Sequence, residues 1–267
     1  MIKLNAYQLK WIAIIGMFLS HVVAAWWAIL PEALRFPFWA AGGFTFPIMG
    51  FFVVEGYRHT SNLKNYMLRL LAVGLIALPF HILALTIPIG GGNLTGYPFI
   101  NIIFSIILSL FVLVLYDKIK SRVLFWLLYI VVIVPVSFLF FEWYFIGVTM
   151  VLMYYIIRNE TARRIVPPLF AAACFLLLTF LTGINATFLH EAIAAGHDVG
   201  SWTNALVAKP EFFNVMLAFP IGIALSAFLL KGYNGERGKN MKWLFYVFYP
   251  LHLAVLAAGI WVIGNFS

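Results

Sequence analysis

Two histidines inside long apolar segments are the residues of this sequence best suited to chemistry. His21 lies eleven residues after Lys10, about 16 Å along a helix and therefore near the centre of a bilayer. An imidazole, with an unperturbed pKa of about 6.5, can take a proton from an attacking nucleophile. His252 follows Pro250, a residue that kinks a helix and often stands beside a cavity. The plainer interpretation of each is a neutral structural histidine bonded to a neighbouring helix.

Other polar residues in or beside apolar segments are secondary candidates, because burying an ionisable group in a bilayer is costly. His81 follows Pro79, and we expect it to be structural. Glu55 lies near the inner end of its segment, where it could pair with Arg58 or Arg69. The remaining polar candidates are Asn101, which is uncharged, and Glu142, which we expect at the membrane interface.

The densest polar loop, residues 56–69, contains Arg58, Lys64 and Arg69 among serine, threonine and asparagine side chains. Such a set could hold phosphates, although ordinary topogenic charge explains it equally well. The sequence has no GxxxxGK[ST], GxGxxG, HExxH or GxSxG motif, so NTPase, Rossmann, zincin and hydrolase functions lack support. With a single cysteine, Cys174, neither an intrachain disulfide nor a CxxC metal site can form, and we expect no metal.

The composition is that of a membrane protein. Hydrophobic residues make up 64% of the chain and charged residues 10%, and the mean hydropathy is +1.00. The long apolar stretches do not alternate with period two, which favours helices over a membrane barrel. We therefore predict an all-α, polytopic integral membrane protein whose residues 1–267 form a single transmembrane helical-bundle domain.

The sequence predicts about nine membrane spans, with a range of eight to ten. They cover residues 9–30, 37–56, 69–88, 99–116, 123–141, 143–157, 165–185, 212–230 and 243–264. With a cytoplasmic N-terminus, all of the 17 lysines and arginines except Arg35 and Lys209 fall on the inner side, which leaves 15 there. Topology thus explains the net charge of +8 without a nucleic-acid partner.

The longest outer segment, residues 186–211, is the expected place for acceptor selectivity. It contains His190, Glu191, His197 and Asp198, and its apolar spacing suggests a short surface helix.

Several segments together resemble the TraX family, membrane proteins named for the F-pilin N-acetyltransferase. The resemblance is spread over essentially the whole chain and comes from five pieces in order. They are Leu9–Ala13 leading to His21, Phe46–Ile48 with Gly56–Thr60, Tyr66–Leu70, Asn101–Ser105, and Leu244–Leu253.

The resemblance implies a membrane-embedded acetyltransferase that uses cytoplasmic acetyl-CoA, related to the transmembrane acyltransferases and located in the bacterial inner membrane. It makes His21 the candidate catalytic histidine. The family often has an acidic residue just before this histidine, and Ser20 stands there in this chain. The candidates for holding CoA are Lys10, Arg58, His59, Lys64, Arg69, Tyr249 and Asn101. His252, Asn101 and Tyr249 could line the cavity and stabilise the oxyanion.

The leading hypothesis is therefore acetyl transfer to an amine or hydroxyl of a peptide, a glycan, a lipid headgroup or a small amine. His21 would either deprotonate the acceptor or become transiently acetylated. The alternative is a proton-coupled transporter or a protein that binds a small molecule or lipid, for which midplane histidines and proline-broken helices would serve equally well. A haem protein with paired axial histidines is a third interpretation.

Overall fold

The computed structural model describes residues 3–27, 29–86, 100–135, 137, 142–194, 210–240 and 242–266. Within them the chain is helical apart from its connections and one isolated bridge between Leu4 and Tyr233. The helices are α1 (Ala6–Ala25), α2 (Glu32–Gly42), α3 (Thr45–His59), α4 (Leu63–His81), η1 (Ile82–Thr86), α5 (Ile102–Lys118), α6 (Arg122–Leu128), η2 (Tyr129–Ile133), α8 (Tyr144–Ile156), α9 (Glu160–Ala194), α11 (Pro210–Lys231) and α12 (Lys242–Phe266). The all-helical prediction is confirmed for this described part.

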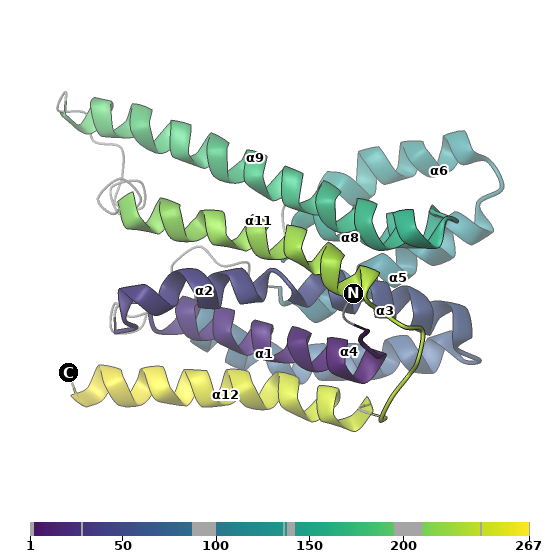
Figure 1. Cartoon of the computed structure of the whole chain (residues 1–267), viewed down its shortest axis with the longest axis horizontal. Coiled ribbons are helices and arrows are strands. Elements are labelled where there is room, and N and C mark those ends of the chain that lie inside the picture. The colour runs from purple at the N-terminus through teal and green to yellow at the C-terminus, as the bar shows by residue number, and fades with distance from the viewer. Residues whose placement is uncertain are drawn as a thin grey trace.

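Among the described residues, five helical segments are long and apolar enough to cross a membrane. They are Ala6–Ala25, Glu32–His59, Leu63–Leu85, Glu160–Leu181 and Trp243–Val262. Shorter apolar helices cover Arg122–Ile133, Tyr144–Ile156 and Val215–Lys231. Each of the nine spans predicted from the sequence overlaps at least one helix. Figure 1 shows the C-terminus at one end of the long axis and the N-terminus nearer the middle of the molecule.

The predicted span 37–56 differs most from the structure. Helix begins earlier, at Glu32, and the segment is broken at Gly43 and Phe44 into α2 and α3. The break lies where α2 packs directly on α11: a methyl group on Gly222 of α11 would come within 1.8 Å of the Ala40 carbonyl oxygen. α2 also packs closely on α1, since a methyl group on Gly16 would lie 2.2 Å from the Ala41 oxygen. Small residues let these three helices pack backbone to backbone.

Asparagine and serine side chains begin several of the helices. Asn5 and Gln8 form a reciprocal capping box at the start of α1. The side chains of Asn62, Asn101 and Ser121 accept backbone N–H groups at the starts of α4, α5 and α6. The polar residues between the apolar segments therefore fix where each helix begins.

The helices that form the site come from opposite ends of the sequence. Figure 1 shows α12, in yellow, running alongside α1, in purple, while α9 and α11 form a neighbouring pair. α12 also packs against α4. This arrangement places the last helix beside the first, and each of them contributes one of the two candidate histidines.

Candidate active site

His21 and His252 form a buried pair between α1 and α12. Nδ1 of His21 lies 2.8 Å from Nε2 of His252, and each residue is only 3% exposed. The two rings are nearly parallel, at 10°, with centroids 5.1 Å apart. The ring of Phe248 is also nearly parallel to that of His252, with the two ring centroids 5.0 Å apart. The sequence predicted both residues as candidates but contained no signal that they touch.

The hydrogen bonds assign one tautomer to this pair. Nδ1 of His252 lies 3.0 Å from the carbonyl oxygen of Phe248, which can only accept, so Nδ1 is the donor. In a neutral ring, Nε2 of His252 then accepts from Nδ1 of His21. Nε2 of His21 is consequently the nitrogen that carries the lone pair. His252 thus orients His21 as a carboxylate orients the histidine of a catalytic triad.

Two further polar residues, His81 and Ser20, lie near the pair but make different contacts. His81 of α4 is fully buried and lies close enough to interact electrostatically with both rings. The hydroxyl of Ser20 donates to the Met17 carbonyl oxygen at 3.0 Å, and its side chain packs against Gly42 of α2. The orienting partner of His21 in this structure is therefore His252.

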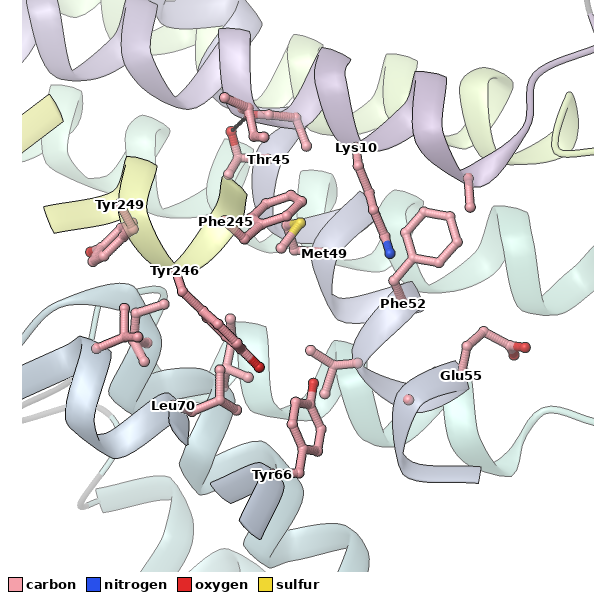
Figure 2. Close-up of a pocket in the computed structure, with 18 of the residues that line it drawn as sticks. Lys10, Thr45, Met49, Phe52, Glu55, Tyr66, Leu70, Phe245, Tyr246 and Tyr249 are labelled. Carbon is pink, nitrogen blue, oxygen red and sulfur yellow. Dashed lines mark hydrogen bonds between the residues drawn. The ribbon is translucent and has the colours of Figure 1, made fainter. Parts of the chain in front are cut away.

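A cavity of about 700 Å³ leads from the end of the bundle where α1 begins toward the histidine pair. Its rim is basic and includes Lys10, Arg69, Arg237 and Lys239. Figure 2 shows the side chains of Lys10, Tyr66 and Tyr246 directed into its middle. The deeper walls are formed by apolar side chains of α1, α3, α4 and α5: Ala13, Ile14, Met17, Met49, Val53, Leu70, Val73, Ile102, Ile103 and Ile106.

The inner end of the cavity reaches residues next to the histidine pair, although neither histidine is itself one of the lining residues. Met17 lines it one helical turn before His21. Tyr249 lines it as well, and its ring contacts that of His252 at a centroid distance of 5.5 Å. A long ligand with a charged end at the rim would thus place its other end beside Tyr249 and the two imidazoles.

The residues that the sequence suggested for holding CoA divide into two groups. Lys10, His59, Arg69 and Tyr249 line the cavity, and Lys10 also lies 4.9 Å from the centre of the Phe52 ring. The others face elsewhere: Arg58, Lys64 and Asn101.

The three residues outside the cavity have other partners or face solvent. Arg58 donates to the Tyr155 carbonyl oxygen at 3.0 Å and lies over the ring of that tyrosine. Lys64 is exposed. Asn101 is buried, donates to the Gly74 carbonyl oxygen at 3.0 Å and accepts from the N–H of Ile103, one residue from the cavity wall.

Glu55 pairs with Arg58 at 3.9 Å, as the sequence suggested, but its closer ion pair with Arg163 was not predicted. Glu55 of α3 lines the cavity and accepts from Arg163 of α9, whose side chain is 3% exposed. Arg163 also donates to Glu160 at 2.8 Å and lies over the Phe51 ring at 4.6 Å. Burial and the nearby Glu55 carboxylate raise the pKa of the rim residue Tyr233, whose phenol is therefore neutral at physiological pH.

Arg237 and Lys239 were also missed as site residues, because in the sequence they are distinguished only as inner-side charges. The signal was the composition of residues 232–240, in which three glycines and several polar residues separate two apolar segments. Of the predicted outer segment, His190 and Glu191 fall on the last turns of α9, which continues to Ala194 in place of a separate short helix. His197 and Asp198 lie outside the described residues.

The comparisons with known proteins agree on one family. The TraX protein family model matches residues 5–259. The chain is also 31% identical over 274 residues to the "Probable fimbrial assembly protein FimC, serogroup H1" of Dichelobacter nodosus, with 96% of each chain covered. No solved structure matches. Both matches extend over nearly the whole chain, and the chain therefore belongs to the TraX family.

Proposed function

We propose that this protein is a transmembrane acetyltransferase that takes acetyl-CoA from the cytoplasm. One observation carries the proposal: the cavity is basic at its rim and apolar along its walls, and its inner end reaches Met17 and Tyr249, beside two hydrogen-bonded histidines. Acetyl-CoA has the same order of parts, with phosphates at one end, an extended arm, and a thioester at the other end. Lys10 and Arg69 would hold phosphate oxygens, and Tyr249 would lie beside the thioester.

In the proposed reaction, the acceptor nitrogen or oxygen attacks the thioester carbonyl carbon while Nε2 of His21 takes its proton. The carbon–sulfur bond then breaks, and the proton passes from Nε2 to the leaving sulfur, which gives CoA and the acetylated acceptor. His252 holds His21 in the required tautomer and shares the positive charge through their hydrogen bond. An acetyl group carried briefly by Nε2 is the covalent variant of the same scheme, and acid quenching would trap it.

The direction across the membrane follows from charge. With the N-terminus in the cytoplasm, the cavity rim opens on the inner side, where the basic loops lie. The acceptor would then reach the histidines from the outer or lateral side of nine spans in a bacterial inner membrane. The name of the Dichelobacter nodosus relative, a fimbrial assembly protein, favours a protein acceptor such as a pilus or fimbrial subunit.

The test is calorimetric titration of acetyl-CoA into purified protein, followed by transfer assays in reconstituted membranes. Arg69→Gln should weaken binding by on the order of tenfold, since it removes a charged hydrogen-bond donor from the rim. Lys64→Gln is the matched control on the same helix, because Lys64 is exposed and lies off the cavity. His21→Ala should retain binding and abolish transfer.

Failure of wild type to bind acetyl-CoA would overturn the proposal. So would full transfer activity in His21→Ala and His252→Ala. Uptake or binding of a small molecule without acetyl-CoA would instead favour the transporter hypothesis. An absorbance band of bound haem would favour the haem-protein hypothesis.

A further inference from the structure

Residues 232–240, here called the rim loop, connect α11 to α12 and form part of the cavity rim through Tyr233, Gly235, Arg237, Lys239 and Asn240. We propose that the rim loop binds the ribose 3′-phosphate of the CoA donor, in a position fixed by the first residues of the chain. This inference rests on the proposed function and assigns one phosphate to one element.

The charges at the rim lack acidic partners. In the described part of the chain, none of Lys10, Arg69, Arg237 and Lys239 has a carboxylate within ion-pair distance. Nε of Arg69 is buried without a hydrogen-bond partner. Lys10 and Arg237 lie close enough for their positive charges to repel. Like charges held together around a cavity are stabilised when a polyanion occupies it.

The four cationic side chains differ in how far they are buried. Lys10 and Arg69 are half-buried side chains of α1 and α4, whereas Arg237 and Lys239 are exposed. In CoA the diphosphate joins the pantetheine arm directly, and the 3′-phosphate lies farther from the thioester. With the thioester beside Tyr249, the diphosphate would lie near Lys10 and Arg69, and the 3′-phosphate near the rim loop.

Backbone hydrogen bonds hold the rim loop against the start of the chain. Leu4 donates to the Gly232 oxygen at 2.8 Å, Asn234 donates to the Leu4 oxygen at 2.9 Å, and Ala6 donates to the Glu236 oxygen at 2.8 Å. Gly238 completes the contact in the left-handed region, at φ +64°. A methyl group there would lie 2.8 Å from Cβ of Tyr7 and 2.9 Å from the Asn5 side-chain oxygen. The loop is thus positioned independently of any ligand.

The experiment compares CoA with 3′-dephospho-CoA by calorimetry. Wild type should bind CoA on the order of ten- to a hundredfold more tightly, as expected for one phosphate with two charged donors. Arg237→Gln/Lys239→Gln should bind CoA as weakly as wild type binds dephospho-CoA, with its affinity for dephospho-CoA unchanged. The matched control is Lys118→Gln/Lys120→Gln, which removes two exposed charges away from the cavity.

A second variant tests the position of the loop without changing charge. Gly238→Ala should lower the preference for CoA over dephospho-CoA at least several-fold, and a thermal denaturation curve would verify that it folds. Equal loss of both ligands in the charge variant, or full preference retained in either loop variant, would overturn the inference while leaving the proposed function intact. Binding of neither ligand by wild type would overturn both.

Discussion

We expect Arg163→Met to destabilise the protein more than any other substitution of a single basic side chain on α9. Its guanidinium is almost fully enclosed, bonds to Glu55 and Glu160, and lies over the Phe51 ring. Removing one partner of a buried pair costs about 3–5 kcal/mol when the other charge is left without a close partner. Glu55 is 29% exposed and still has Arg58 at 3.9 Å, so we expect a loss near the lower end, about 3 kcal/mol.

The assay is a double-mutant cycle in detergent micelles, with unfolding by denaturing detergent followed through tryptophan fluorescence. Glu55→Gln/Arg163→Met should be more stable than Arg163→Met by about 1–2 kcal/mol, since the amide needs no counter-charge. Arg158→Met, in the same region but exposed, serves as the control and should stay within about 0.5 kcal/mol of wild type. An Arg163→Met protein within about 1 kcal/mol of wild type, or a double variant no better than the single one, would refute the reasoning.

Three further predictions follow from single contacts. His252→Gln should lower the transfer rate on the order of 10²- to 10⁴-fold with little change in acetyl-CoA affinity. Ser20→Ala should change the rate only a few-fold. Equal losses of rate in the two variants would contradict the assignment of His252 as the orienting partner. Asn101→Leu should cost about 2 kcal/mol in the unfolding assay, because the buried Gly74 carbonyl and Ile103 N–H lose their partner. Gly222→Ala should lower the melting temperature markedly by forcing α2 and α11 apart, while Gly56→Ala, with its nearest neighbour at 3.5 Å, should not.

Hydropathy and charge located most of the helices approximately, because burial in a bilayer depends on local composition, but they did not reveal the break between α2 and α3. Side-chain partners were harder to predict. His21 and His252 are separated by 231 positions, and only the packing of α12 on α1 brings their nitrogens together. Local spacing carries no information about which distant helix becomes a neighbour.

The rotation of each helix was the second feature that the sequence left open. Arg58 and Arg69 lie near the two ends of the same polar loop, and in the sequence they are equivalent candidates for binding phosphate. The rotation of α3 about its axis directs Arg58 to the Tyr155 carbonyl, whereas the rotation of α4 directs Arg69 to the cavity. Charge alone also failed to separate the rim loop from other inner loops, because its place depends on hydrogen bonds to Leu4 and Ala6.

The hydrogen bonds of Leu4 and Ala6 have a practical consequence for protein engineering. Ala6 itself lines the cavity, so any polypeptide fused ahead of α1 is attached at the rim. An affinity tag or fluorescent reporter joined there would compete for the same space as a ligand and lower its apparent affinity. The other end of the chain, after α12, lies at one end of the long axis, away from the start of α1 (Figure 1). Purification handles and reporters are therefore better placed after α12, so that the rim is unobstructed during ligand titrations.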